Sequence, residues 1–445
     1  MSVNILISNN FNNITKSIVP WYDNTLIDYF TKELNDNVLI VSRNTAKKLP
    51  RLENTTIYCV SKKLNFYGNK ILCVNNNVLY FRNLLSAIKF GNIHFAYTKK
   101  IYIGGGVFTY NTAFTDKNIL IDNIHVLLNK NDTSMFYSFM NINNYICNDL
   151  VESDTYYYYT LFNKYTQEKL YLNLLSKVLI SGIEKKGRNG ITKSVFNPSN
   201  LVFTELYKRF PLITTKKMFI RGIIEELLFF IRGDTDSSKL EEKGVKIWKG
   251  NTSREFLDSI GKHEYKEGEM GPMYGYQWRN FNGSGLDQLN DIINKIKSDP
   301  ESRRLLMTTY NPLQADEGVL YPCHSIIMQF YIRDNMLDLF VYNRSSDLFL
   351  GLPFNITMSS LLLIIISKAT NKIPGTLTIG LGDSHIYESH YDSVKKQLFR
   401  IPYDFPTMNI NKEINSIKDI EKLSYEDFIL SNYNSYSSIK AEMVV

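Results

Sequence analysis

Residues 321–347 read YPCHSIIMQFYIRDNMLDLFVYNRSSD, and this stretch predicts a hairpin with reactive side chains at both ends. Polar and apolar residues alternate through most of it, which is typical of strands with one buried face. The pair Asp334-Asn335 divides the alternating segment and suits a two-residue hairpin turn. With that turn, Arg333 pairs with Met336. The stretch therefore predicts two adjacent antiparallel strands.

Cys323 and Arg344 are the reactive residues of this hairpin. The register places Ser325 opposite Arg344, so Cys323 is a diagonal neighbour of Arg344 on the same face, roughly 7–8 Å away at the backbone. A free cysteine has a pKa of about 8.5, and a nearby guanidinium favours the nucleophilic thiolate. The hairpin is thus either a site of nucleophilic catalysis or a buried cysteine and a surface arginine that share a hairpin.

The composition is that of an ordinary globular protein with a mild positive charge. Hydrophobic residues make up 44% and charged residues 21% of the 445 residues, and this length predicts two or three domains. The formal net charge of +7 favours anionic small substrates, but no long run of lysine and arginine is present in the sequence. We therefore expect no specific nucleic-acid partner.

The cysteines and the apolar segments predict a reducing intracellular compartment such as the cytoplasm. The cysteine spacing fits neither a metal site nor a disulfide framework, so we expect no metal. The first thirty residues lack the pattern of a secretory signal, so we do not expect secretion. The longest apolar stretch, Leu361 to Ile366, is too short to span a bilayer, so we expect no membrane partner. The cysteines are Cys59, Cys73, Cys147 and Cys323.

A change in pattern near residue 165 predicts two domains, residues 1–165 and 166–445. The first part contains short runs of β-forming residues separated by a few helical stretches, which is typical of an α/β domain. The second part begins with helices at about 168–182 and 218–231, and the second helix ends at Gly233. The predicted strands of the first part are residues 38–41, 57–60, 100–103 and 156–162.

Ten motifs, in order along residues 166–445, resemble those of thymidylate synthases. The resemblance implies an α+β domain that methylates dUMP, with 5,10-methylenetetrahydrofolate as the donor of both carbon and hydride and with no metal. It also implies a homodimer, because in this family tandem arginines reach across from the partner subunit. The motifs are GRNG at Gly187, FPLITTKK at Phe210, RGIIEELLFFIRGDT at Arg221, GVKIW at Gly244, GPMYGYQWR at Gly271, DPESRR at Asp299, YPCHS at Tyr321, NRSSDLFLGLPFNI at Asn343, GDSHIY at Gly382 and IKAEMVV at Ile439.

The resemblance implies roles for individual residues. A thiolate that adds to C6 of uracil makes C5 nucleophilic, and a phosphate dianion needs several guanidinium groups. The catalytic residues implied are Cys323, Glu226, Tyr274 and Arg344. Those implied for dUMP binding are Arg188, Arg303, Arg304, His324, Gln329, Arg344, Ser345, Asp347, Asn355, His385 and Tyr387. Those implied for folate binding are Trp248, Asn251, Asp347, Gly351 and Val445.

Asn355 and Glu226 fit this chemistry from their sequence surroundings. Asn355 lies in the apolar run 352–356, and its amide complements O4 and N3–H of uracil rather than the reversed pattern of cytosine. The alternative is that Asn355 caps a helix over 357–368. Glu226 lies on an apolar helix, where a carboxylate needs a hydrogen bond or a raised pKa. Glu225 is the expected solvent-facing neighbour.

The first 165 residues resemble dihydrofolate reductases. The matching segments are VPW at Val19, DYF at Asp28, VSRNT at Val41, YIGGG at Tyr102 and NDT at Asn131. Glycines after a strand let the backbone approach the phosphates of a dinucleotide. The resemblance implies an α/β domain that binds NADPH and regenerates tetrahydrofolate. The residues implied for NADPH binding are Arg43, Thr45, Ser61, Lys62, Gly104, Gly105 and Gly106.

The expected active centre of this reductase-like domain departs from the family at four positions. Leu26 stands where the family has the acid that holds the pteridine, and Thr55 stands where an arginine binds the folate carboxylate. Ser42 replaces a glycine beside the nicotinamide, and Ile14 replaces a loop glycine. An alternative is therefore a monofunctional thymidylate synthase with a non-catalytic reductase-like scaffold. A dCMP hydroxymethyltransferase is a further alternative, against which Asn355 argues.

Overall fold

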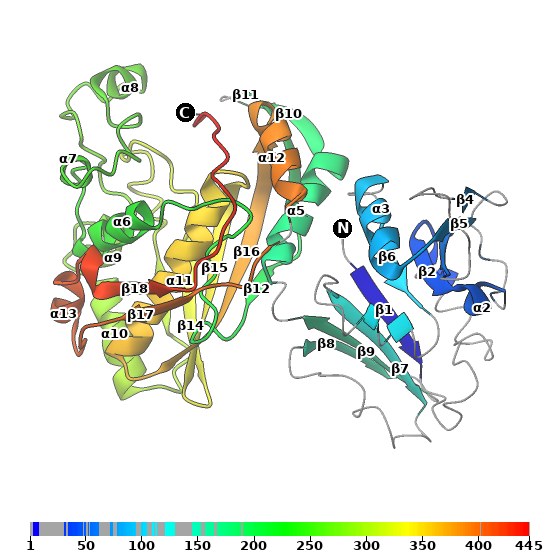
Figure 1. Cartoon of the computed structure of the whole chain (residues 1–445). Helices are drawn as coiled ribbons and strands as arrows, with labels where there is room; N and C mark the ends of the chain where they lie inside the picture. The colour runs from blue at the N-terminus through cyan, green and yellow to red at the C-terminus, as the bar shows by residue number, and fades with distance from the viewer. Residues whose placement is uncertain are drawn as a thin grey trace. The chain divides into compact units, whose positions relative to one another are not determined.

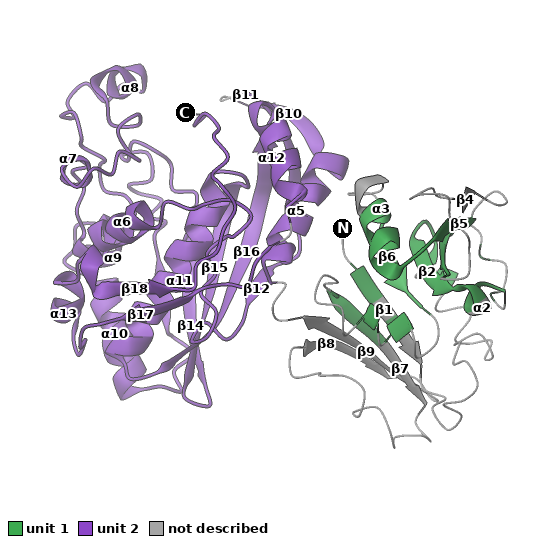
Figure 2. Cartoon of the chain, in the orientation of Figure 1, with its two compact units in different colours: residues 1–166 green, residues 167–445 purple. Residues whose placement is uncertain are grey.

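The computed structural model shows two compact units, Met1–Thr166 and Gln167–Val445 (Figure 2). The change in sequence pattern predicts the boundary one position earlier, between residues 165 and 166. The described residues are 3–8, 31–32, 34–47, 49, 52, 54–61, 72–73, 78–94, 99–104, 109–110, 112–113, 121–129, 145–152, 156–163, 167–187, 190–400 and 402–444.

The first unit is an α/β unit built on one mixed sheet. Its described strands are hydrogen-bonded in the order β4-β5-β3-β2-β6-β1-β7-β9-β8 (Figure 1). Neighbours from β5 to β7 run parallel, whereas β4, β9 and β8 are antiparallel to their neighbours. The described elements are β1 (Val3–Ser8), β2 (Val38–Ser42), α2 (Arg43–Ala46), β3 (Thr56–Val60), β4 (Leu72–Cys73), β5 (Val78–Phe81), α3 (Leu84–His94), β6 (Ile101–Ile103), β7 (Asn123–Asn129), β8 (Tyr145–Glu152) and β9 (Tyr156–Asn163).

Continuous apolar runs explain the parallel centre of this sheet. All four residues from Val38 to Val41 in β2 are fully buried, as are the three residues of β6. Strands that are covered on both faces read as uninterrupted apolar segments. The strands predicted at 38–41, 57–60, 100–103 and 156–162 are confirmed as β2, β3, β6 and β9.

The second unit is an α+β unit whose main sheet has the order β10-β11-β16-β15-β14-β13, with β12 also paired to β16 (Figure 1). Strands β15 and β16 run parallel, and the other pairs are antiparallel. Strands β17 and β18 form a separate antiparallel pair. The expected fold classes of both parts of the chain are therefore confirmed.

The second unit begins with α5, which starts one residue before the predicted helix over 168–182. The described strands are β10 (Ile183–Gly187), β11 (Gly190–Phe196), β12 (Leu201–Phe203), β13 (Leu306–Thr308), β14 (Ile327–Arg333), β15 (Met336–Asp347), β16 (Ile373–Tyr387), β17 (Thr407–Ile410) and β18 (Phe428–Ser431). The described helices are α5 (Gln167–Ser181), α6 (Ile220–Arg232), α7 (Ser238–Glu241), α8 (Arg254–Ser259), α9 (Gly275–Arg279), α10 (Gln288–Ser298), α11 (Gly351–Ala369), η5 (Glu388–His390), α12 (Tyr391–Leu398), α13 (Ile417–Glu421) and η6 (Tyr425–Asp427).

Helix α11 is the core helix of the second unit. It packs against β15, β16 and α6, and all residues from Leu361 to Ile366 are buried. By length and composition alone it would qualify as a membrane span, but 83% of its most apolar window is buried inside the protein. We therefore interpret α11 as a core helix, because its apolar surface is already covered by the sheet.

The predicted hairpin is confirmed over most of its length and ends earlier than expected. Arg333 pairs with Met336, and the ladder continues to Ile327 and Tyr342. Ser325 does not enter the ladder opposite Arg344 as predicted. Its φ is +53°, and its amide donates to the side chain of Asn343 at 2.9 Å instead of to a backbone carbonyl. This break turns the chain immediately after Cys323 and His324.

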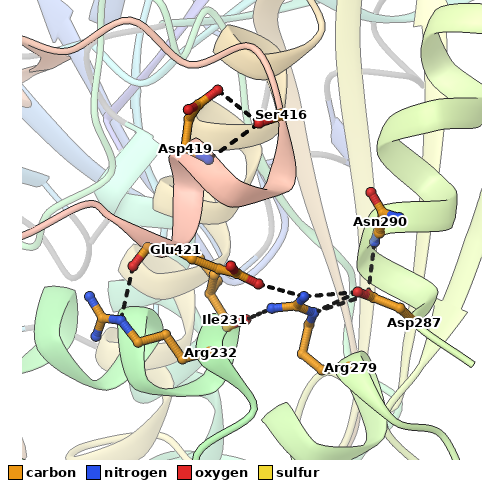
Figure 3. Close-up of polar contacts among 8 residues, drawn as sticks. All are labelled: Ile231, Arg232, Arg279, Asp287, Asn290, Ser416, Asp419 and Glu421. Atoms are coloured by element: carbon orange, nitrogen blue, oxygen red, sulfur yellow. Dashed lines mark hydrogen bonds and ion pairs between the residues drawn. The ribbon is translucent and has the colours of Figure 1, made fainter. Parts of the chain in front are cut away.

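Helix α6 ends where the sequence predicted. Gly233 adopts the left-handed conformation with a φ of 73° and terminates the helix. Arg232, in the last turn, donates to the backbone oxygen of Glu421 at 3.1 Å (Figure 3). It also donates to the backbone oxygen of Leu423 at 2.6 Å. The C-terminal end of the helix that carries Glu226 is therefore attached to α13 and the residues after it.

Arg279, at the end of α9, makes the second attachment of α6 (Figure 3). It donates to the backbone oxygen of Ile231 at 2.5 Å. Its guanidinium also pairs with Asp287 at 2.8 Å and with Glu421 at 2.7 Å. Asp287 in turn accepts from the amide of Asn290 and so caps α10. One guanidinium therefore joins α6, α9, α10 and α13.

Candidate active site

Cys323 and Tyr274 lie against each other in the second unit. The Tyr274 hydroxyl is 3.5 Å from Cys323 Sγ and accepts the backbone amide of Cys323 at 3.4 Å. The Tyr274 ring is 1% exposed and stacks on the His324 ring with 4.4 Å between centroids. Its φ of 45° is uncommon for a residue other than glycine. The phenol is thus fixed beside the sulfur by its backbone and by its neighbours.

Opposing effects act on the pKa of the Cys323 thiol. Burial raises this pKa, the hydrogen bond with Tyr274 and the charge of Arg344 lower it, and the net direction is upward. Arg344 therefore acts in the predicted direction, but burial has the larger effect. Burial in this structure thus favours the neutral thiol form of Cys323.

Arg344 is fixed on the segment that precedes the cysteine. Its Nε donates to the carbonyl oxygen of Pro322 at 2.6 Å, and one terminal nitrogen donates to that of Tyr321 at 3.0 Å. The guanidinium lies 5.0 Å from the centre of the Tyr321 ring. The amide of Ser345 donates to the Cys323 oxygen at 3.4 Å, which holds the two ends of the hairpin together. A guanidinium has five N–H donors, so this one retains donors for an anion.

Glu226 is a buried carboxylate held by Trp248. The indole nitrogen donates to Glu226 Oε1 at 2.7 Å, and the Trp248 ring lies 6.0 Å from that of Tyr274. Burial raises the pKa of Glu226 to about 7, and the Trp248 hydrogen bond acts in the opposite direction. The prediction that Glu225 faces solvent is wrong. Glu225 is 5% exposed and pairs with Lys243 at 2.6 Å, because α6 is covered on most sides.

His324 is a buried neutral imidazole. Burial lowers the pKa of His324 to about 4, so its ring carries no charge at neutral pH. Its Nδ1 lies 3.2 Å from the Ser325 hydroxyl. His324 therefore offers a neutral hydrogen-bonding group next to the thiol.

Asp347, His385 and Tyr387 lie near one another at one end of β15 and β16. Asp347 and His385 are partners in the parallel register, and the His385 and Tyr387 rings meet edge to face at 5.2 Å. The His385 Nδ1 lies 3.0 Å from the Asp383 carboxylate. Asp347 accepts the amide of Phe349 at 2.9 Å and so stabilises the start of α11. Ser345, which contacts Cys323, lies two residues before Asp347 on β15. These residues therefore extend the site from the cysteine along β15.

Asn355 lies inside α11, three residues after Leu352. The alternative role of Asn355 as a helix cap is wrong, because the helix begins at Gly351 and not after Asn355. The side chain of Asn355 is half-buried, so part of it is accessible to a ligand.

The other predicted residues that the structure describes lie at exposed positions, in turns or at the start of α11. Arg303 and Arg304 are exposed in a turn before β13, and Gln329 lies on the exposed face of β14. Asn251 is 7% exposed in the turn after Trp248. Gly351 begins α11. The positions of Arg188 and Val445 are outside the described residues.

Two buried ionisable residues near Asp347 were not singled out from the sequence. Lys216 is 5% exposed and donates to the carbonyl oxygen of Phe349, and its burial lowers the pKa of Lys216 to about 7. His390 is fully buried, and its Nδ1 lies 4.0 Å from Asp347 Oδ1. The motif that contains Lys216 is visible in the sequence, but only the fold brings Lys216 and His390 to Asp347.

Four of the residues predicted to bind NADPH lie in the described part of the first unit. The Gly104 amide donates to the Ile40 oxygen, and a Cβ on Gly104 would lie 3.2 Å from the Leu39 side chain, so glycine suits this position. Arg43 begins α2, and Thr45 and Ser61 are buried. Lys62, Gly105 and Gly106 lie outside the described residues, as do Leu26 and Ile14.

Two of the residues that differ from the reductase family, Ser42 and Thr55, lie in the described part of this unit and have structural roles. The Ser42 hydroxyl caps α2 by accepting the amide of Thr45. Thr55 is 2% exposed, and its hydroxyl donates to the Leu34 oxygen at 3.0 Å. A buried hydroxyl paired in this way cannot replace a guanidinium that binds a carboxylate. Across the described ranges, no group of three or more potential metal ligands occurs.

Comparisons with known proteins agree with this arrangement. A family model described as "Thymidylate synthase" matches residues 169–445. The chain is 34% identical to the "Bifunctional dihydrofolate reductase-thymidylate synthase" of Paramecium tetraurelia, over 96% of this chain and 95% of that protein. It is 43% identical to the "Thymidylate synthase" of Herpesvirus ateles, over 62% of this chain and 98% of that protein.

A third relative matches smaller shares of both chains than the Paramecium protein does. The bifunctional enzyme of Leishmania major is 42% identical, over 63% of this chain and 55% of that protein. The fold of the second unit and the family match define it as a folate-dependent nucleotide methyltransferase. The chain belongs to the bifunctional dihydrofolate reductase–thymidylate synthase family. Its second unit is the thymidylate synthase, and the enzymes of this family use methylenetetrahydrofolate to methylate dUMP.

Proposed function

We propose that the second unit methylates dUMP through Cys323, Tyr274 and Glu226. The observation that carries this proposal is the Tyr274 hydroxyl, held 3.5 Å from the Cys323 sulfur. Cys323 adds to C6 of uracil, which makes C5 the nucleophile toward the one-carbon unit of the folate. Tyr274 takes part in removal of the C5 proton. Glu226, whose pKa of about 7 lets it hold or release a proton near neutral pH, acts on O4 through water.

Substrate recognition is assigned to the groups around this centre. Arg344 keeps donors for the phosphate, and the half-buried amide of Asn355 matches uracil O4 and N3–H. The other groups proposed for dUMP are Arg188, Arg303, Arg304, His324, Gln329, Ser345, Asp347, His385 and Tyr387. Those proposed for the folate are Trp248, Asn251, Asp347, Gly351 and Val445.

Replacement of Tyr274 by phenylalanine tests this assignment. The variant keeps the ring and loses the hydroxyl, so we expect the rate of dTMP formation to fall by about 100-fold or more. The rate is measured by the release of tritium from C5 of labelled dUMP and by the formation of dTMP. Tyr265→Phe is the control, because its hydroxyl donates to Glu317 on the surface. Unchanged turnover in Tyr274→Phe would refute the role.

We also propose that the synthase acts as a homodimer through the exposed face of its main sheet. Leu306, Ile327, Tyr331 and Phe340 from β13, β14 and β15 are between 37% and 64% exposed on this face. Their register places Leu306 and Phe340 on either side of Gln329. Such an apolar face suits a self-complementary interface of two-fold symmetry. Arg303 and Arg304 precede β13 and would reach the partner's phosphate site.

For the first unit we propose NADPH-dependent reduction of dihydrofolate at a rate well below that of methylation. Membership of the family supports the activity, and the position of Gly104 supports NADPH binding. Thr55, buried and bonded to Leu34, supports the low rate, since it leaves the folate carboxylate without its cation. Leu26, at the position of the catalytic acid, supports it as well.

Oxidation of NADPH with added dihydrofolate, measured on the full chain, tests this proposal. We expect slow oxidation that accelerates in Leu26→Asp, which restores a carboxylate at the position of the acid. Fluorescence titration with NADPH measures cofactor binding separately. Oxidation as fast as methylation in the unaltered chain would contradict the proposal.

A reducing intracellular compartment is the proposed location, without a membrane or nucleic-acid partner. The free thiols of Cys59 and Cys323 support it, because an accessible catalytic thiol is preserved under reducing conditions. Localisation of a tagged chain by microscopy in its host would test it, and a secreted or membrane-bound chain would contradict it.

A further inference from the structure

The C-terminal tail, residues 433–444, is attached to the second unit at a series of points. The Tyr433 hydroxyl donates to the Ile213 oxygen at 2.8 Å, and the Tyr436 amide donates to the Thr214 oxygen at 2.9 Å. Further along, Arg400 donates to the Ser437 oxygen at 2.7 Å. The tail thus runs along the segment that leads to Lys216 and ends near His390.

His390 makes the contact nearest the end of the described tail. Its Nε2 lies 2.8 Å from the carbonyl oxygen of Glu442. A carbonyl only accepts, so Nε2 carries the hydrogen and donates. In the neutral ring, Nδ1 is then the unprotonated nitrogen, and it has no hydrogen-bond partner among the described residues. Nδ1 faces Asp347 Oδ1 at 4.0 Å, which is longer than a hydrogen bond.

The surroundings of His390 hold its ring in one place. His390 is fully buried, and its ring contacts those of Phe349 at 5.4 Å and Tyr387 at 5.7 Å. Lys216 packs on Phe349 as well, with its Nζ 3.8 Å from the centre of the Phe349 ring. One imidazole therefore touches the tail, Tyr387 and the start of α11. It also lies beside Asp347.

We propose that His390 is a positioning residue for methyl transfer, which holds the tail through the Glu442 carbonyl and keeps it next to Asp347. This inference rests on the folate-binding role proposed above for Asp347. A tail fixed at this point covers the folate side of the site and excludes water from it. Loss of the Nε2 contact frees the end of the tail, and the affinity for the folate falls.

Two substitutions of His390 distinguish the role of Nε2 from that of Nδ1. His390→Gln places its amide nitrogen near the position of Nε2 and can still donate to Glu442. His390→Asn places its amide near Nδ1 and cannot reach the tail. We expect His390→Asn to raise the KM for methylenetetrahydrofolate by about tenfold, the effect of one hydrogen bond of about 1.4 kcal/mol. We expect a change of less than about twofold in His390→Gln.

The readouts distinguish positioning from a general loss of structure. The KM for dUMP and the melting temperature should change little in either variant, while kcat should change less than the folate KM. His263→Asn is the matched control, because His263 also pairs with an aspartate, Asp258, but lies exposed on the surface. Equal effects of the asparagine and glutamine variants, or an unchanged folate KM in both, would overturn the proposal.

A second measurement leaves His390 intact. A chain that ends at Lys440 lacks the Glu442 carbonyl and also Val445, which is proposed to bind the folate, so we expect a rise in folate KM at least as large as that in His390→Asn. An unchanged folate KM in this chain would also overturn the proposal. Asp347→Asn tests the underlying assignment separately. If that variant binds folate normally, the proposed role of Asp347 is wrong. The rate of trypsin cleavage after Lys440 then still measures whether His390 holds the tail.

Discussion

Tyr274 has a backbone conformation that costs about 1–3 kcal/mol for a residue other than glycine. Its φ of 45° persists because Phe230 stacks on one side of the ring at 5.1 Å and His324 on the other at 4.4 Å. The consequence is a hydroxyl with little freedom to leave the Cys323 sulfur. Strained residues held by their surroundings are common where a group must be fixed in advance of a reaction.

Glu226 gives a prediction about stability and pH. Burial raises its pKa from 4.5 to about 7, so the folded protein binds more protons than the unfolded chain between these values. Stability is therefore lost as pH rises from about 4.5 to above 7, by at most about 3 kcal/mol. Glu226→Gln keeps an acceptor for Trp248 and removes this loss. We expect the variant to melt at a similar temperature at pH 5 and at a higher temperature than the wild type at pH 8.

Thermal unfolding of both proteins across this range measures the effect. The variant should at the same time methylate poorly at every pH, because the acid–base group is lost. Parallel melting curves, with the same difference at pH 5 and pH 8, would show that Glu226 does not titrate in this window.

At the level of secondary-structure elements, α6 depends on the guanidinium of Arg279. Arg279→Ala leaves the half-buried Asp287 without its pair and frees the Ile231 carbonyl (Figure 3). We expect the free energy of unfolding to fall by about 2 kcal/mol, less than for a fully buried pair because Asp287 and Glu421 are partly exposed. Denaturant titration of the synthase transition measures this change.

Arg333→Ala is the control for that prediction. Arg333 pairs with Asp338 at 2.6 Å on an exposed part of the hairpin, and its side chain is 44% exposed. We expect a loss below about 1 kcal/mol. A loss in Arg279→Ala no larger than this would mean that α6 is held by apolar packing alone.

The elements also show which features the sequence could predict. The end of α6 at Gly233 and the pairing of Arg333 with Met336 follow from local rules for glycine and for short turns. The positive φ of Ser325 does not, because it depends on Asn343 from the next strand. The burial of Glu225 does not follow from local rules either, because its partner Lys243 lies 18 residues further along the chain. The motifs identified the residues near Cys323, but tertiary contacts decide its pKa.

At the scale of the whole molecule, the exposed apolar face of the main sheet predicts dimerisation. Phe340→Asp introduces a charge at the proposed interface, where the ring also lies against Gly380. We expect this variant to become monomeric and to lose most of its methylation activity, because the tandem arginines no longer reach a partner's site. Sedimentation or light scattering measures the mass. Phe399→Asp, at an exposed residue that follows α12, is the control. A dimeric Phe340→Asp chain would contradict the proposed interface.

The proposed methylation of dUMP by the second unit depends on Cys323 as the nucleophile. The most direct test follows dTMP formation by the purified full chain and by Cys323→Ser, with dUMP and methylenetetrahydrofolate and without added NADPH. We predict turnover by the unaltered chain, with tritium released from C5, and none by a variant that is folded to the same melting temperature. Turnover by Cys323→Ser close to that of the unaltered chain would show that Cys323 is not the nucleophile.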